Sequence, residues 1–343
     1  MEPARKNNFD FSRLLFALFV VITHSYALTG NDQIDFLFQA TSGKMSLSYI
    51  GVRGFFVISG YLILQSLTRS ANVIDYMWKR ILRLFPGLIV MLIFTICLVP
   101  CVYEETRIQL LDNSTYLTYL PNNLKLYTPQ FTIDGVFESN PFRSSVNGSL
   151  WTIQYEFSLY LILIFLFTVR KNLIFTRIIV AGAFTALLFG NTLFYDNLKI
   201  YNENLLDFGY FFFSGCLFSA FSISEIINKK IFILASLVVL ILSIPTAMFS
   251  ITKLIAIPIL VILTSASSTK YINEIGSKIG DLSYGIYIYA FPIQQTIVYF
   301  SKCNTLQLIL ASIIITSIIA SFSWHFIEKK ALRYKSIFAR LRI

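Results

Sequence analysis

The chain has 343 residues, of which 56% are hydrophobic and only 13% are charged, and its mean hydropathy is +0.68. A soluble domain carries roughly 25% charged residues, so this chain has too few charges to cover a water-facing surface, and its apolar surplus must face lipid. The net charge of +10 does not indicate nucleic-acid binding, because the basic residues lie between apolar segments and form no basic face on a soluble domain.

Ten apolar segments follow one another along the chain and predict an all-α, polytopic transmembrane bundle of about ten spans. They run from Ser12 to Thr29, Met45 to Leu67, Leu84 to Val102, Ser149 to Val169, Ile178 to Phe194, Leu205 to Ile223, Ile231 to Phe249, Leu254 to Ser265, Ile279 to Phe300 and Leu306 to Trp324. The eighth segment is short for a span of about 20 residues. We expect a single domain over residues 1–343, with one long connection from Tyr103 to Gly148.

Basic residues alternate between the two sets of connections and so predict the orientation. Of the 28 Lys and Arg, 19 lie in the set that includes both ends of the chain, 7 lie in the opposite set, and two lie inside apolar segments. The positive-inside rule then places both termini in the cytoplasm, with a basic tail over residues 325–343, and the 103–148 connection outside. The pattern is that of a multi-pass protein of a bacterial inner (cytoplasmic) membrane.

A cleaved signal peptide is the alternative for the first segment, because Ser25-Tyr26-Ala27 resembles a small-residue cleavage site. Cleavage would leave nine spans with the same alternation of charge. Asp10 and Arg13 at the start of the apolar stretch argue against it.

Ionisable residues at membrane depth are candidates for function. Arg13 and His24 are 11 residues apart, so they project from one helix face about 16 Å apart along the axis. Glu156, in the fourth segment, should reach a depth similar to that of His24, where a carboxylate could orient the imidazole. The alternatives are a packed His24, an Arg13 that snorkels to the boundary, and a structural Glu156 paired with Arg53.

Lys79, Arg80 and Arg83 precede the third segment with helical i, i+3/i+4 spacing, and they predict a basic helix face in the cytoplasmic interface. Such a face suits an anion site for phosphates, because guanidinium groups bind phosphate in a fork. Ordinary positive-inside anchoring and anionic lipid binding are the alternatives. His325, at the inner end of the last segment, is interpreted as an interfacial residue. The four cysteines show no metal-ligand spacing, so no metal site is expected.

Six blocks in chain order resemble motifs of the bacterial acyltransferase family three, integral-membrane enzymes that acylate sugars and other hydroxyl acceptors. They are Arg13 with His24 (Arg-x10-His), GVRGFFVISGYLI at 51–63, WKRILRLFP at 78–86, SLWTIQYE at 149–156, LSYGIY at 282–287 and FIEK at 326–329. The resemblance extends over almost the whole chain.

Two departures limit what can be carried over. The family often has Asp where this chain has Arg53, and often has His where this chain has Ala290. Some members also carry a hydrolase-like domain after the last helix, and we expect this chain to be the membrane module alone.

The resemblance implies transfer of an acyl group, usually acetyl, from acyl-coenzyme A to a saccharide hydroxyl. No tightly bound cofactor is expected. Arg13, Lys79, Arg80 and Arg83 would hold the donor, His24 and Glu156 would catalyse transfer, and Trp151 and Tyr284 would line the pocket. Ten spans with buried charges would also suit an oligosaccharide transporter or flippase, or a receptor without catalysis. Neither the acceptor nor the oligomeric state follows from the sequence.

Overall fold

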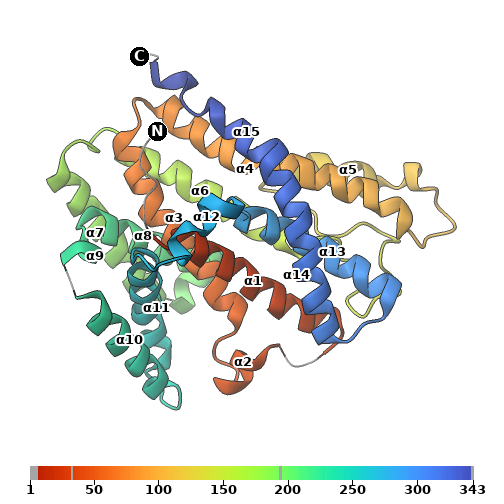
Figure 1. Cartoon of the computed structure of the whole chain (residues 1–343), viewed down its shortest axis with the longest axis horizontal. Helices are drawn as coiled ribbons and strands as arrows, with labels where there is room; N and C mark the ends of the chain where they lie inside the picture. The colour runs from red at the N-terminus through yellow and green to blue at the C-terminus, as the bar shows by residue number, and fades with distance from the viewer. Residues whose placement is uncertain (1–6, 32–33, 193–194, 227, 341–343) are drawn as a thin grey trace.

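The computed structural model describes residues 7–31, 34–192, 195–226 and 228–340. This part of the chain folds into helices and contains no β-strand (Figure 1). The helices are α1 (Phe9–Leu28), α2 (Phe36–Ala40), α3 (Leu47–Arg69), α4 (Val73–Leu98), α5 (Ser114–Leu124), α6 (Ile153–Leu163), α7 (Leu173–Thr192), α8 (Tyr195–Ala220), α9 (Ile223–Ile226), α10 (Lys229–Ser243), α11 (Phe249–Ser265), α12 (Ile275–Ile279), α13 (Ser283–Ser301), α14 (Thr305–Ser323) and α15 (Lys329–Ala331). A π-helix joins α14 to α15, and 3₁₀ turns follow α15. Phe194 and both ends of the chain, residues 1–6 and 341–343, lie outside the described residues.

Each of the ten predicted apolar segments overlaps one of these helices. Six stretches of the described chain are long and apolar enough to cross a membrane: Phe9–Leu28, Leu47–Arg69, Val73–Cys101, Gly148–Leu166, Leu173–Thr192 and Thr305–Ala339. The other four segments fall on α8, α10, α11 and α13, of which α10 has 15 residues and α11 has 17. The chain is therefore a multi-pass membrane protein, and the count of ten spans stays a prediction.

Polar side chains define where the central helices begin. Ser46 Oγ accepts a hydrogen bond from the backbone N–H of Tyr49 at the start of α3, and the Asn72 side chain accepts one from Asp75 N–H at the start of α4. Asn304 forms a capping box with Gln307 at the start of α14. Side chains of this kind satisfy backbone donors that a helix leaves unpaired in its first turn.

The basic residues Lys79, Arg80 and Arg83 belong to the same helix as the third apolar segment, and their place in the cytoplasmic interface stays a prediction. Residues Val73–Leu98 form one continuous helix, with Pro86 inside it. Neighbouring helices can stabilise a proline within a membrane helix, because they re-satisfy the backbone groups that the proline frees. Lys79, Arg80 and Arg83 therefore stand on the first turns of a helix that belongs to the bundle.

Glycines allow α3 and α8 to touch backbone to backbone. A Cβ atom at Gly60 would overlap the carbonyl oxygen of Phe212, and one at Gly215 would overlap that of Val57. Small residues permit such close approach between membrane helices. Gly60 in the 51–63 block thus packs against α8, while its neighbour Ser59 faces the cavity described below.

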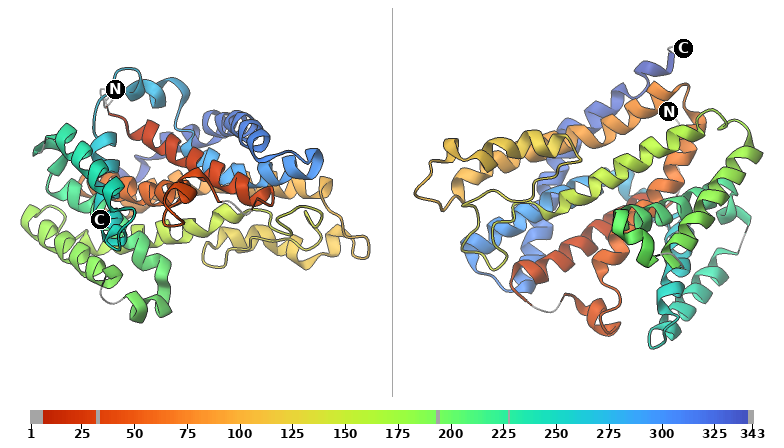
Figure 2. Two further views of the ribbon diagram at one scale, coloured as in Figure 1. Left: turned by 90° about the horizontal axis from the view of Figure 1, so that it is seen from below. Right: turned by 180° about the vertical axis from the view of Figure 1, so that it is seen from behind.

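The connection between α4 and α6 forms an ordered cap on the bundle. Tyr119 and Phe137 are fully buried in it, and Asn140 donates hydrogen bonds of 2.9 Å to the carbonyl and the side chain of Gln295 on α13. The cap lies at one end of the molecule, and the first and last described residues lie at the other (Figures 1 and 2). Both ends of the described chain thus share one side of the bundle.

Candidate active site

A cavity of about 880 Å³ lies between α1, α3, α4, α6, α13 and the segment that follows α15. Its volume is in the range of roughly 300–1,000 Å³ usual for small-molecule sites. The charged side chains on its wall are those of Arg13, Arg69, Lys79, Arg80, Arg83, Glu156 and Lys335. With six basic groups and one carboxylate on the wall, the cavity suits an anionic ligand.

Six of the eight predicted site residues line this cavity: Arg13, Lys79, Arg80, Arg83, Glu156 and Tyr284. They come from four helices that are distant in the sequence, and the bundle brings them together. His24 and Trp151 are not among the lining residues.

Arg13 and Arg83 are tied to each other through Asp281, which precedes α13. Arg13 Nη1 lies 3.1 Å and Arg83 Nη2 lies 2.7 Å from the same carboxylate oxygen, Oδ2. Ser283 Oγ donates to the other oxygen at 2.7 Å. Burial alone would raise the pKa of Asp281, but Arg13 and Arg83 outweigh it and lower the pKa to about 2. This ion triad links α1, α4 and α13 at one end of the cavity.

Arg80 stands out because its charge has no such partner. Its Nη2 donates to Ser66 Oγ at 3.2 Å, and its guanidinium faces the rings of Tyr76 and Tyr160 with centroids at 5.5 and 5.9 Å. Its Nε and Nη1 are buried without a hydrogen-bond partner, and no carboxylate of the described residues lies within 4 Å. Arg80 therefore adds to the cavity wall a positive charge that no carboxylate of the described residues neutralises.

Lys79, one residue earlier on α4, is partly neutralised. Its Nζ lies 2.7 Å from the buried Asp75 carboxylate and donates to Ser70 Oγ at 3.3 Å. The structure thus divides the predicted basic cluster: Arg83 and Lys79 hold carboxylates of the protein, and Arg80 does not.

Glu156 faces the cavity from α6 and is held by two hydroxyl groups. Ser59 Oγ donates to its Oε1 at 3.0 Å, and the Tyr160 hydroxyl donates to the same oxygen. The alternative of a pair with Arg53 is wrong, because Arg53 Nη2 lies 2.5 Å from Asp207 on α8. Glu156 thus keeps its second oxygen for another contact in the cavity.

His24 lies farther along α1 than the cavity wall. Its ring meets Phe291 edge to face, with centroids 5.3 Å apart, and its Nδ1 is buried without a hydrogen-bond partner. In the described part of the chain no hydrogen bond or ion pair joins His24 to Glu156, although the sequence suggested that they could meet.

Two further hydroxyl groups line the cavity, those of Thr152 and Tyr287. They lie 2.7 Å apart, and the Tyr287 ring packs on Phe55.

The two predicted aromatic residues have different surroundings. Tyr284 lines the cavity, donates its hydroxyl to the Leu84 carbonyl at 2.9 Å and lies 6.0 Å from the Arg83 guanidinium. Trp151 packs against Tyr155 and Phe208, away from the cavity.

His325 is exposed on the continuation of α14, and its Nδ1 lies 2.9 Å from the Ser321 carbonyl oxygen.

Sequence reasoning missed three residues: Tyr160, which lines the cavity, Asp281, which binds Arg13 and Arg83, and Glu328, which lies beside α4. Glu328 is buried at the end of the π-helix, accepts a hydrogen bond from Ser323 Oγ at 2.8 Å and lies beside Gly87 of α4. A signal was available for two of them, since Asp281 directly precedes the 282–287 block and Glu328 lies inside the 326–329 block. Tyr160 could have been found as the residue one helical turn after Glu156.

The fold and the cavity define a multi-pass membrane protein with a basic internal cavity. The model of the acyltransferase domain family matches residues 6–325, and the chain belongs to this family. An O-acetyl transferase of Shigella phage Sf6 is 29% identical over 97% of this chain and 98% of its own length. Nodulation protein 10 of Rhizobium leguminosarum bv. viciae is 26% identical over 100% of this chain and 97% of its own length. No solved structure matches the chain. The protein is therefore an acyltransferase. Membership of this enzyme family excludes the alternative class, an oligosaccharide transporter or flippase.

Proposed function

We propose that this enzyme transfers an acyl group, acetyl in the first instance, from acyl-coenzyme A to a hydroxyl of a cell-surface saccharide or of its lipid-linked precursor. The observation that carries the proposal is the basic cavity with the unneutralised Arg80 and the carboxylate of Glu156 on its wall. The name of the Shigella phage relative supports acetyl transfer to oxygen. Six basic groups on the wall fit a donor that carries several phosphates.

In the proposed reaction the acceptor oxygen attacks the thioester carbonyl carbon, the new C–O bond forms and the C–S bond breaks. A base takes the proton of the acceptor hydroxyl, and the leaving thiolate is protonated to the free thiol. Near neutral pH an imidazole suits this task best. We propose His24 as the base, because its Nδ1 is a buried nitrogen that still lacks a partner.

This assignment gives the two substrates different routes. His24 lies about 16 Å beyond Arg13 along α1, so a donor in the cavity and an acceptor at His24 would meet near Thr152 and Tyr287. Glu156, with Ser59 and Tyr160 bound to one oxygen, would orient the acyl end of the donor. Glu156 is also the alternative base, since it already lies on the cavity wall.

Release of coenzyme A tests the proposal. Purified full-length protein with acetyl-coenzyme A and a saccharide acceptor should produce free thiol and an acetylated saccharide in equal amounts. Surface polysaccharide serves as the acceptor in this assay. In a second measurement, the mass of the polysaccharide from a deletion strain is compared with that from a complemented strain. Polysaccharide of identical mass in both strains would contradict the saccharide acceptor.

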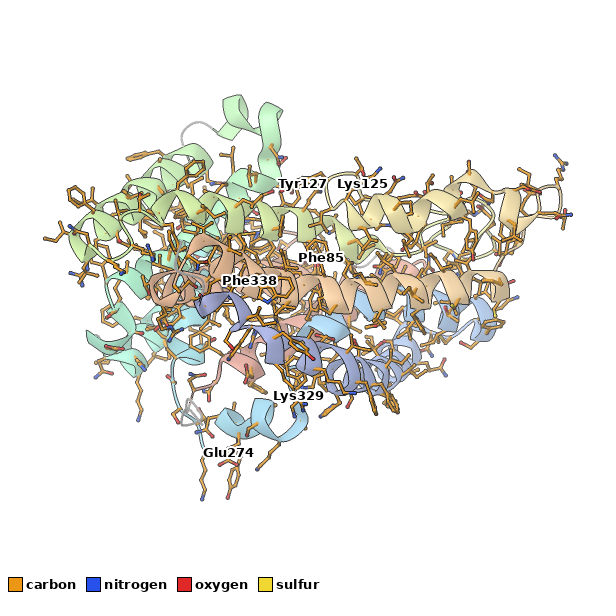
Figure 3. All side chains as sticks on the ribbon, turned by 90° about the horizontal axis from the view of Figure 1, so that it is seen from above. Phe85, Lys125, Tyr127, Glu274, Lys329 and Phe338 are labelled. Atoms are coloured by element: carbon orange, nitrogen blue, oxygen red, sulfur yellow. The ribbon has the colours of Figure 1, made fainter. Side chains whose placement is uncertain are left out.

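We also propose that the enzyme lies in a bacterial inner membrane with both termini in the cytoplasm and the 103–148 connection outside. The 19-to-7 split of basic residues supports this orientation. Labelling positions can now be chosen for exposure: Lys125 lies on the cap and Glu274 precedes α12 (Figure 3). With the four native cysteines replaced by serine, Lys125→Cys should react in intact cells and Glu274→Cys only in opened vesicles, and the reverse pattern would invert the orientation.

A further inference from the structure

The chain after α15 turns back along α4 and forms part of the cavity wall. Its 3₁₀ turns, Leu332–Tyr334 and Ile337–Arg340, bring four side chains to the cavity: Leu332, Lys335, Ser336 and Ala339. We call residues 332–339 the C-terminal clasp. Figure 1 shows this segment running beside α4, and Figure 3 shows Phe338 where it meets that helix.

Two residues at the start of α4 hold the clasp in place. Trp78 Nε1 donates a hydrogen bond of 3.0 Å to the Tyr334 carbonyl, and its ring meets the Phe338 ring edge to face with centroids 5.2 Å apart. The Asn72 side-chain nitrogen donates to the Phe338 carbonyl at 3.2 Å. These contacts fix the backbone on both sides of Lys335, so its side chain stays at the cavity mouth.

Lys335 differs in position from the arginines of α4. It comes from the segment after α15 and, like Arg69 at the end of α3, it is exposed, whereas Arg80 and Arg83 stand on α4 within the bundle. No carboxylate of the described residues lies within 4 Å of its Nζ. A lysine so placed would meet the part of an anionic ligand that stays closest to water.

We propose that Lys335, held by the C-terminal clasp, binds the 3′-phosphate of the coenzyme A donor. This inference rests on the proposed function. The thioester of the donor must reach the interior, where Glu156 lies, so the phosphorylated adenosine at its opposite end stays at the mouth. The diphosphate between the two ends then falls to Arg80, and the 3′-phosphate to Lys335.

Calorimetry on purified full-length protein with two ligands, coenzyme A and 3′-dephospho-coenzyme A, tests this assignment. Lys335→Ala should weaken binding of coenzyme A by about fivefold, as expected for one partly screened charge contact. The same variant should bind the dephospho ligand with unchanged affinity, because the group that Lys335 contacts is absent. The matched control is Lys330→Ala, which removes an exposed lysine that lies over Phe326 and outside the cavity.

Equal weakening for both ligands, or no weakening for either, would overturn the assignment. Trp78→Ala, which frees the clasp, should lower the affinity for coenzyme A more than that for the dephospho ligand, and an equal loss for both would show that the clasp does not position Lys335. Wild-type protein that binds neither ligand would instead contradict the proposed donor. Weak binding by Arg80→Ala, together with unchanged binding by Lys335→Ala, would leave the proposed function intact and reject only this inference.

Discussion

Arg53 on α3 and Arg80 on α4 are both enclosed by aromatic rings inside the bundle, but only one has a counter-ion. Arg53 lies 2.5 Å from Asp207, and the face of Tyr49 covers it at 3.5 Å. Arg80 meets only the Ser66 hydroxyl and the rings around it, and two of its nitrogens are unpaired. Arg80 lines the cavity, whereas Arg53 does not.

This difference separates buried charges that the protein itself neutralises from one that it does not. A buried charge is costly unless it is paired and hydrogen-bonded. Arg53 has a carboxylate partner within the protein, and so have Arg13 and Arg83 in Asp281, although Nε of Arg53 and Nε of Arg13 lack a hydrogen-bond partner. Arg80 has no carboxylate partner among the described residues. The buried Nδ1 of His24 also lacks a hydrogen-bond partner.

The largest effect is expected when the unpartnered imidazole is removed. His24→Gln should lower turnover at least about 100-fold, because a positioned general base contributes typically 10²–10⁴-fold. Donor affinity should be unchanged, since His24 does not line the donor cavity. Initial rates of thiol release and donor binding by calorimetry measure the two quantities.

The chain contains one further histidine, and it supplies the control for this variant. His325 is exposed and hydrogen-bonded to the Ser321 carbonyl, so His325→Ala should keep most of the activity. If His24→Gln turned over normally while Glu156→Gln was inactive, the base would be Glu156, and the lack of a partner at His24 would have no catalytic meaning.

Next in size is the expected effect at the neutralised arginine. Asp207→Asn leaves the charge of Arg53 buried and unpaired, which typically costs about 3–5 kcal/mol of stability. Thermal unfolding in detergent should show a clear loss. Donor affinity of the protein that remains folded should not change.

The double variant Arg53→Met/Asp207→Leu removes both charges and should recover most of the stability, since a well-packed apolar pair often replaces an ion pair without loss. Weaker donor binding in the double variant would place Arg53 in the binding site and remove the contrast with Arg80.

A smaller effect is expected at the unneutralised arginine, and it should appear in binding and not in stability. A charge-assisted contact with phosphate contributes roughly 1.5–3 kcal/mol, so Arg80→Ala should weaken coenzyme A binding by about tenfold or more. Its unfolding temperature should stay the same or rise, because an unpaired buried charge is removed. Arg177→Ala is the matched control, since Arg177 lies over the Phe221 ring away from the cavity. Unchanged affinity in Arg80→Ala would show that the guanidinium group of Arg80 does not contact the ligand.

Local patterns in the sequence predicted where helices occur, but not how long each is. All ten apolar segments fall on helices, because hydrophobicity over about 20 residues is a local property. The spacing of Lys79, Arg80 and Arg83 predicted a basic helix face, but only the tertiary structure shows that this face continues into α4 and lines a cavity. The short helices α10 and α11 show a limit of hydropathy, because hydropathy alone does not determine how a helix crosses the bilayer.

For the site, the family blocks identified the residue types, and the fold determined which of them meet. Six of the eight predicted residues line the cavity. The partner of Arg53 lies 154 positions away on α8, and no periodicity connects the two. Asp281 was missed for a related reason, because a single carboxylate before a helix acquires meaning only when two arginines from other helices converge on it.

The smallest effect is expected from pH acting on Asp281, whose charge holds Arg13 and Arg83 together. A carboxyl group with a lowered pKa contributes stability that is fully present above its unfolded pKa of about 3.9 and is lost as the pH falls through its folded value. The folded pKa of Asp281 is about 2, because the two arginines outweigh the effect of burial. Between about pH 5.5 and about pH 8 the ion triad should therefore stay intact.

Any change in turnover over that interval should belong to the base and disappear in the residual activity of His24→Gln. Asp281→Asn should leave the shape of the pH profile unchanged while it lowers stability, because it removes the carboxylate that Arg83 holds, whereas Arg13 keeps its ion pair with Asp10. A profile that moved with Asp281→Asn and not with His24→Gln would show that the triad titrates in the working range, and that the carboxylate shared by two arginines is not held ionised as the structure indicates.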